Sequence, residues 1–492
     1  MNKHKFVQPF CMKFVVGILA FIFLSASATP LPLKNSNAPL SFTKAVKAAQ
    51  KNDPWLTGNV HKQSAIESMS RAVNTLPDPK VSVTLANLPV NGFDFGQEGM
   101  TQAKVGISQM FPRGDTLAIK SQQLKIQSEA FPYQRKDRES KVAVTVGSLW
   151  LDAYRIQQSV ALIEKNRSLF EQLADVATAS YSSALGKTRQ QDIVRAQLEL
   201  TYLDDRLDKL AQQKNHYEGM LSQWLATFSR GSNSGDETYS VTDYSLNNTL
   251  HNIVLSQELP QIALLTPDLV AKESWLKPSE LIIHFLSHPS VMVFENKIKA
   301  TKTGIKLTQQ KYKPEWGVTA SYGYRTDDPM GRSRADLFSV GVTFDLPLFT
   351  ENRQDQEVKS AISQTEAMKT EKLLLLRQLL GTYSSAKGRL LRLKDRQNLY
   401  TNQLLPQIQD QAEVSLTAYT NDDGDFSEVV RSRIAVLNAE IDALTINVEE
   451  QKIRLELNYL FIGNLGMAAI PQKTNNANLT RSRQSMAIWG EE

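Results

Sequence analysis

Two stretches of the sequence decide the fold: Val105-Gly-Ile-Ser-Gln-Met-Phe-Pro112 and Val340-Gly-Val-Thr-Phe-Asp-Leu-Pro347. In both, apolar residues alternate with small or polar ones, and valine, glycine and proline recur at the same spacing. A period of two predicts a β-strand with one apolar face, and the proline predicts its end. The stretches lie 235 positions apart, which indicates that the chain repeats itself.

Further pairs of matched segments support an internal duplication. The offset between matched positions stays near 235 to 238 throughout. One unit of helix, strand, strand, long helix, turn and helix is therefore predicted to occur twice. The pairs are Leu76-Pro-Asp-Pro79 with Tyr312-Lys-Pro314, Val81–Leu85 with Trp316–Tyr322, and Tyr181, Gly186 and Arg195 with Tyr419, Gly424 and Arg433.

Four alternating strands follow from the repeat. Each has about 10 residues, the length that crosses a bilayer at a tilt, and Trp316, Tyr322 and Tyr324 suit an aromatic girdle. Alternation alone also fits a soluble sheet over a core. In a membrane, four strands cannot close, because small barrels need about eight. We therefore expect several chains to share one barrel, with the loops Pro89–Met100 and Thr326–Asp336 outside the cell.

Two long helical hairpins are predicted from apolar residues at steps of three and four. The stretch from the second strand of each repeat to its turn has about 70 residues, which can reach roughly 100 Å as a helix. Pro132 and Pro406 should kink or interrupt these helices, because proline lacks an N–H and clashes with the preceding turn. The apolar seams comprise Val142, Val146, Leu149, Ala153, Ile156, Val160, Ile163 and Phe170; Ile193, Ala196, Leu200, Leu203, Leu207, Leu210, Tyr217, Leu221 and Trp224; and Ile434, Leu437, Ile441, Leu444, Val448 and Leu455.

The N-terminus resembles an export signal. Three lysines precede the apolar run Phe14–Leu24, which is too short to span a bilayer, and Ala26-Ser-Ala28 follows it. This pattern predicts a signal peptide at residues 1–28 rather than an uncleaved anchor. The single cysteine, Cys11, would leave with the signal, so we expect no disulfide and no thiolate ligand in the mature chain.

The composition of the 492 residues is that of a folded chain, with 41% hydrophobic and 22% charged residues. A net charge of +5 is too small to predict nucleic-acid binding. Beyond the signal no run of 18 apolar residues occurs, so a membrane crossing would have to use β-strands. The predicted organisation is a signal peptide (1–28), a first repeat (29–226), an irregular linker or equatorial region (227–280), a second repeat (281–467) and a disordered tail (468–492).

The turns of the two hairpins differ in charge. The first is Ala184-Leu-Gly-Lys-Thr-Arg-Gln-Gln-Asp192, and the second is Asn421-Asp-Asp-Gly-Asp-Phe426. Asn, Asp and Gly are ordinary turn formers, so turn chemistry alone explains the acidic cluster. If symmetry brings several copies together on an axis, however, the carboxylates would form a ring that attracts cations and narrows an entrance.

We find little basis for catalysis or for a bound metal or cofactor. His284 and His288 would share a helix face, but Pro289 follows at once and no third ligand is evident, so structural or helix-end roles are expected. The sequence has no nucleophile elbow, and Gly186-Lys187 lacks the strand and second glycine of a phosphate-binding loop. We predict that the protein is not an enzyme.

Several motifs together resemble a known family. They are Leu76-Pro-Asp-Pro79, Val105–Pro112, Gly186-Lys-Thr-Arg-Gln-Gln-Asp-Ile-Val-Arg-Ala-Gln-Leu198, His288-Pro-Ser-Val291, and Leu346-Pro-Leu-Phe349 with Asn352-Arg353. With them, nearly the whole mature chain is similar to the TolC family of outer-membrane efflux proteins. The resemblance implies a mixed α and transmembrane β fold. Four strands per chain would enter a trimeric twelve-stranded barrel, and coiled-coil hairpins would form a periplasmic tunnel.

The resemblance also implies a function. It describes a passive channel in the outer membrane of a Gram-negative bacterium, with its helices in the periplasm. The implied partners are two further copies of the chain, outer-membrane lipid, a periplasmic adaptor (membrane fusion) protein and an inner-membrane pump of the proton-driven resistance-nodulation-division type. Met100-Thr-Gln102 is most similar to channels of cobalt-zinc-cadmium and copper-silver resistance, which implies heavy-metal ions as cargo. A type I protein-secretion duct and a coiled-coil scaffold without a pore remain alternatives.

The expected functional residues lie at the two turns. For adaptor contact they are Gly186, Lys187, Thr188, Arg189, Gly424 and Phe426, and for the entrance constriction they are Asp422, Asp423 and Asp425. The second turn departs from the family pattern, because Asp422 stands three residues after Tyr419, where glycine is common.

Overall fold

The structure is a computed structural model that describes residues 39–182, 189–230, 239–243, 253–271, 275–421 and 424–466. The predicted signal peptide and C-terminal tail lie outside the described residues. Among the residues that are described, none of the helices has the length and apolar character needed to cross a membrane.

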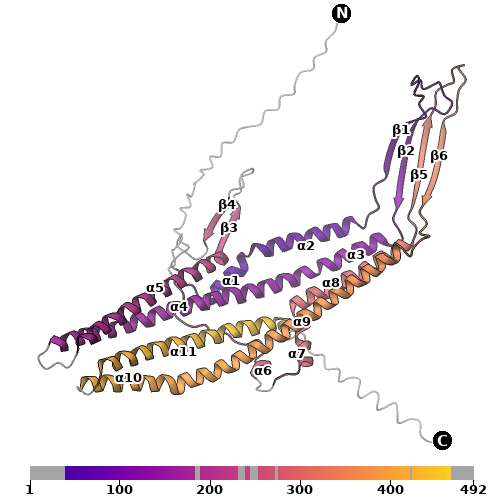
Figure 1. The fold of residues 1–492 in the computed structure, drawn as a ribbon. Coiled ribbons are helices and arrows are strands. Elements are labelled where there is room, and N and C mark those ends of the chain that lie inside the picture. The colour runs from indigo at the N-terminus through magenta and orange to yellow at the C-terminus, as the bar shows by residue number, and fades with distance from the viewer. Residues whose placement is uncertain are drawn as a thin grey trace, which may run out of the picture. The chain divides into compact units, whose positions relative to one another are not determined.

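The four predicted strands form one antiparallel sheet in the order β1-β2-β5-β6 (Figure 1). The first repeat supplies one hairpin, the second supplies the other, and β2 pairs with β5 along nine residues, Ala103–Phe111. The segments predicted as loops connect the strands within each hairpin. The strands are β1 Lys80–Ala86, β2 Gln102–Phe111, β5 Trp316–Tyr324 and β6 Leu337–Phe344.

The helices follow the predicted duplication. In each repeat a helix leads into the strands, and a long helix returns from them to a turn and a further helix (Figure 1). In the first repeat these are α1 Phe42–Asn52, α2 Pro54–Ala72, α3 Thr116–Ser128, α4 Ala130–Ser182 and α5 Gln190–Leu225. In the second they are α7 Pro278–Phe285, α8 Pro289–Gln309, α9 Gln354–Leu399, α10 Leu405–Thr420 and α11 Phe426–Leu460, with short 3₁₀ turns at Gln310–Tyr312 and Ile462–Gly466.

Both long helices are irregular at the predicted prolines. In a helix, a proline ring clashes with the backbone carbonyl four residues earlier. For Pro132 this is the carbonyl of Ser128, and for Pro406 it is the carbonyl of Asn402. Ser128 is the last residue of α3, and Asn402 lies in a π-helical turn, Tyr400–Leu404, between α9 and α10. The two repeats therefore resolve the same conflict differently, one by a break and one by a wider turn.

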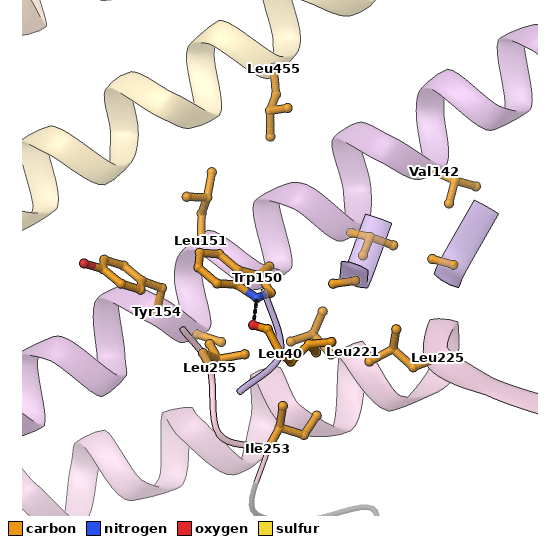
Figure 2. Packing of buried hydrophobic residues seen from close by; sticks show 14 of the residues in the cluster. Leu40, Val142, Trp150, Leu151, Tyr154, Leu221, Leu225, Ile253, Leu255 and Leu455 are labelled. Carbon is orange, nitrogen blue, oxygen red and sulfur yellow. Dashed lines mark hydrogen bonds between the residues drawn. The ribbon is translucent and has the colours of Figure 1, made fainter. Parts of the chain in front are cut away.

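Three apolar clusters hold the helices together. The first centres on Trp150, whose indole N–H donates to the Leu40 carbonyl at 3.0 Å (Figure 2). Phe42 meets the Trp150 ring edge-on. The second surrounds the buried Tyr383 of α9. The third joins α4, α5 and α11 near the hairpin turns and contains Ile163, Phe170, Ala177, Ala196, Leu203, Phe426, Val430 and Leu437.

The linker is more regular than predicted. It contains a short antiparallel hairpin, β3 Ala226–Arg230 with β4 Tyr239–Asp243, and a short helix, α6 Pro267–Ala271. Five-residue strands separated by a Gly- and Ser-rich stretch give too weak a period to detect in the sequence. The extended segment just before α6 is held by side chains of α11. The Ile262 N–H donates to the Gln451 side chain at 2.8 Å, and the Leu265 N–H donates to the Asn458 side chain at 2.8 Å. The side-chain amides of Gln451 and Asn458 thus give hydrogen-bond partners to backbone N–H groups that no neighbouring strand pairs with in this segment.

Candidate functional site

The sheet has two chemically different faces. The register aligns Val81, Ile107, Ala320 and Val340 across all four strands, and the next aligned row is Val83, Val105, Tyr322 and Phe338. Because side chains alternate, the opposite face carries the intervening residues. That face is made mostly of small and polar residues, and Met110 and Leu337 are its larger apolar members. The small and polar residues are Lys80, Ser82, Thr84, Ala86, Gln102, Lys104, Gly106, Ser108, Gly317, Thr319, Ser321, Gly323, Ser339, Gly341 and Thr343.

The apolar face is exposed in the single chain. Val83 is 79% exposed, Phe338 71% and Val340 63%, although a soluble sheet would bury such residues against a core. Phe111 and Trp316 stack at 4.5 Å where their strands meet the helices, and Tyr324 ends β5 at the opposite end of the sheet. An apolar band this broad, with aromatic rings at both ends, marks a surface that contacts lipid or another protein.

Both edges of the sheet are open. Among the described residues no further strand pairs with β1 or β6, so each edge presents unpaired N–H and C=O groups. A wet edge could bond to water, but an edge in lipid must find a strand. In the single chain the sheet thus has an exposed apolar face and two open edges.

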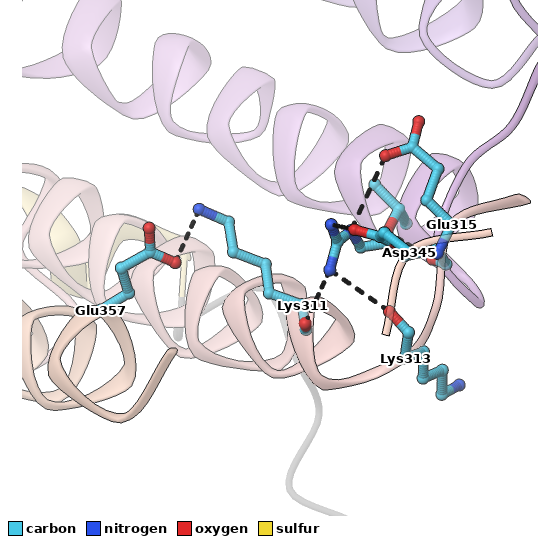
Figure 3. A network of polar contacts seen from close by, with 7 residues as sticks. Lys311, Lys313, Glu315, Asp345 and Glu357 are labelled. Atoms are coloured by element: carbon cyan, nitrogen blue, oxygen red, sulfur yellow. Dashed lines mark hydrogen bonds and ion pairs between the residues drawn. The ribbon is translucent and has the colours of Figure 1, made fainter. Parts of the chain in front are cut away.

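An ionic network ties the sheet to the helices. Arg113, just beyond β2, contacts the carboxylates of Asp345 and Glu315, which lie at the ends of β6 and β5. Its guanidinium also donates to the Lys311 carbonyl at 2.9 Å, and Lys311 pairs with Glu357 of α9 at 2.8 Å (Figure 3). The network crosses between the repeats and links the ends of both β-hairpins to the start of α9. No local sequence pattern predicts the contacts of Arg113, because its partners Lys311, Glu315 and Asp345 lie about 200 residues or more further along the chain.

At the first turn, Gly186, Lys187 and Thr188 lie outside the described residues. Arg189 is exposed and precedes α5, and its backbone N–H donates to the Asp192 carboxylate at 2.9 Å. An acidic side chain in the first turn of a helix is stabilised by the helix dipole. The turn thus leaves the Arg189 side chain exposed while its backbone is fixed.

At the second turn, Asp422 and Asp423 lie outside the described residues, whereas Gly424 and Asp425 are exposed. A Cβ on Gly424 would sit 2.6 Å from the Tyr419 nitrogen, so only glycine fits there. Asp425 caps α11 by accepting from the Ser427 N–H at 3.1 Å.

The two turns influence each other electrostatically. Hydrogen bonds from the N–H and hydroxyl of Ser427 hold the pKa of Asp425 below its ordinary value, and the positive charges of Arg195 and Arg189 lower this pKa further. The structure therefore brings residues of the basic turn near the acidic one within a single chain. The predicted difference in charge between the turns becomes an attraction between neighbouring hairpins.

Phe426 differs from the other residues expected at the tips. Its side chain is 2% exposed, meets the Tyr419 ring at 5.6 Å and belongs to the cluster shared with α4 and α5. In this chain the ring therefore packs the turn against the core and is not on the surface. The helical spacing of Phe426 with Val429 and Val430 carried this signal, since all three are buried.

The two histidines lie at helix ends. His288 is fully buried, accepts from the Ser290 N–H as the cap of α8, and its other ring nitrogen lies 3.1 Å from the Tyr459 carbonyl. His284 lies in the last turn of α7, beside Asn464. Within the described ranges no group of three or more potential His, Cys, Asp or Glu ligands occurs.

Comparison with known proteins adds the fold. No protein-family model matches the sequence, and no curated protein matches it. Among solved structures, the chain resembles CusC, whose crystal structures concern folding and transmembrane channel formation. The TM-score is 0.63 and the identity 13%, and the match covers 85% of this chain and 91% of CusC. It resembles the CmeC outer membrane channel of Campylobacter jejuni (TM-score 0.66, 13% identity, 86% and 85% covered). The open state of the MtrE outer membrane channel of Neisseria gonorrhoeae is also similar, with a TM-score of 0.63 and 14% identity over 86% of this chain and 88% of that one.

The chain thus has the fold of bacterial outer-membrane channel proteins. The TolC-like architecture predicted from the sequence, with long helices and a four-stranded antiparallel sheet, is confirmed at the level of fold.

Proposed function

We propose that this protein belongs to the TolC family and is the outer-membrane channel of a tripartite efflux system in a Gram-negative bacterium. The observation that carries the proposal is the sheet: it is apolar on one face, polar on the other and open at both edges, and it continues into long helical hairpins. A closed barrel needs these properties, with lipid outside and water inside. The fold shared with known outer-membrane channels supports the same function.

Three copies of the chain would complete the barrel. Four strands cannot close, whereas twelve can, with β1 of one copy pairing with β6 of the next. Pairing would satisfy both edges, and the exposed valines and aromatic side chains would face the lipid. The chain itself carries no energy-converting motif, so transport through the barrel is passive and depends on a partner pump.

The helical tips would receive the cargo in the periplasm from an adaptor and a proton-driven pump of the resistance-nodulation-division type. Arg189 and Gly424 are exposed and suit adaptor contact, together with Gly186, Lys187 and Thr188. Asp425, with Asp422 and Asp423, would line the entrance constriction. For Phe426 we propose a packing role that shapes this tip, because its ring is buried.

The proposed cargo is heavy-metal ions. The support is the segment Met100-Thr-Gln102 before β2, which is similar to that of metal-resistance channels. Deleting the gene should lower tolerance to at least one of zinc, cadmium, cobalt, copper and silver. Unchanged tolerance to every metal, with sensitivity to dyes or antibiotics instead, would contradict the metal cargo but not the channel.

Single-channel recording tests the channel itself. Purified protein should assemble as trimers and give discrete conductance steps in planar lipid bilayers. Trimers that never conduct would contradict the proposal and favour a coiled-coil scaffold without a pore. The control is the same preparation after heat dissociation, which should lose both the trimer and the steps.

A further inference from the structure

The sheet β1-β2-β5-β6 carries charge of one sign in its strands. Within these four strands, Lys80 of β1 and Lys104 of β2 are the only charged residues. A charged side chain inside a membrane-spanning strand is costly unless it faces water. The position of these two lysines is therefore informative about the water-filled side of the sheet.

Both lysines lie on the polar face. Lys104 is paired with Thr84 on one side and Gly323 on the other, and Lys80 is paired with Ser108. These neighbours are small; Lys80 is exposed and Lys104 is half-buried in the single chain. Because Val83 and Val105 alternate with them on the same strands, the ammonium groups lie on the side opposite the apolar face.

No carboxylate neutralises the two lysines. Among the described residues neither has an ion pair. The acidic residues at the helix end of the polar face, Glu315 and Asp345, are already in contact with Arg113. At the loop end, Asp336 accepts from the Arg325 N–H at 3.0 Å and from the hydroxyl of an apolar-face tyrosine. The strand part of the polar face is thus purely cationic.

The size of a twelve-stranded barrel sets how strongly these charges act. Strands about 4.8 Å apart, tilted by about 40°, give a wall roughly 12 Å from the axis, so inward lysines lie within about 10 Å of a passing ion. At 0.15 M salt the Debye length of about 8 Å weakens the field but does not remove it. For three Lys104 side chains we expect chloride to be favoured over potassium roughly threefold, and roughly tenfold or more at 0.01 M.

We propose that Lys104, assisted by Lys80, makes the barrel anion-selective, so that the strand part of the channel favours anionic solutes over free cations. The inference rests on the proposed channel function and adds a selectivity-determining residue to it. The two lysines form separate levels, because Lys104 is aligned with Thr84 and Lys80 with Ser108, four residues further along each strand.

Reversal potentials in a salt gradient test the proposal. In planar bilayers, the wild-type trimer should prefer chloride over potassium, and the preference should grow as the salt falls from 0.15 M to 0.01 M. Relative to the wild type, Lys104→Gln should lower the chloride-to-potassium permeability ratio about threefold at 0.15 M, Lys80→Gln with Lys104→Gln should lower it further, and Lys104→Glu should lower it more than Lys104→Gln does. The matched control is Lys62→Gln on the exposed surface of α2, which should leave the ratio unchanged.

The outcomes separate the inference from the function. Conductance in wild type and variants, with the same ratio in all of them, would overturn the role of Lys104 and leave the channel intact. Absence of conductance in the wild type would overturn the channel. Since each variant must conduct for its ratio to be measured, the recording itself shows that the altered barrel has assembled.

Discussion

An arginine should destabilise the protein strongly on one face of β6 and hardly at all on the other. Val340 lies in the central row of the sheet, level with Ile107 and Ala320, and is 63% exposed on the apolar face. If that face contacts lipid, Val340→Arg places a charge near the middle of the bilayer, which costs about 2–4 kcal/mol in each chain. This corresponds to a loss of roughly 30-fold to 1,000-fold in the folding equilibrium per chain.

The neighbouring residue provides the control. Ser339→Arg introduces the same side chain at almost the same depth, but on the polar face, where it reaches water and should change stability by less than about 0.5 kcal/mol. Urea titration of protein refolded into phospholipid vesicles measures both variants under identical conditions. Equal losses would refute the assignment of the faces, and a larger loss for Ser339→Arg would show that the polar face meets the lipid.

Two predictions concern the helical part. Phe426→Ala should destabilise the protein by about 3–5 kcal/mol, because it leaves a cavity at the second turn. The control Val414→Ala, at a side chain that is 68% exposed, should cost under about 0.5 kcal/mol. Equal denaturant midpoints for the two variants would contradict the buried position of Phe426. Burial lowers the pKa of His288, so the unfolded chain takes up a proton below about pH 6.5 before the folded chain does, and stability should fall as pH drops through that range. His288→Asn keeps a capping side chain for α8 and should flatten this dependence in midpoints measured from pH 8 to 5; an equal slope in both proteins would exclude His288 as its source.

The sheet could be predicted because strand signals are local. Alternation defines which residues of a strand share a face, and the repeated valine, glycine and proline spacing identified the second copy. The register of β2 against β5 is different: it pairs Val105 with Tyr322, more than 200 residues later, and no local pattern specifies that. The contacts of Arg113 with both ends of the second hairpin depend on this register and were not predicted for the same reason.

The tips were predicted in composition but not in geometry. Turn-forming residues located them, yet the role of Phe426 depends on how α11 packs against α4 and α5. The prediction assigned Phe426 to the turn, although it is the first residue of α11. When Phe426 is counted with the apolar residues of α11, the predicted seam that starts at Ile434 extends by about two helical turns and includes this ring in the core. The π-helical turn before Pro406 shows the same limit, because a proline predicts an irregularity but not whether the helix breaks or widens.

Charge along the proposed path constrains the cargo. A cation would first meet Asp425 at the tips, where the negative charge attracts it. At the level of Lys104 it would be repelled, and the factor by which its local concentration is lowered is, for a divalent ion, the square of the factor for a monovalent one. A pump that keeps the entrance concentration high can drive ions across such a step, but the step still lowers the flux. Metal ions would therefore leave most readily as neutral or anionic complexes. If Lys104→Glu increased tolerance to a metal that the deletion strain cannot survive, free cations would be the transported form. If it decreased tolerance, complexes would be.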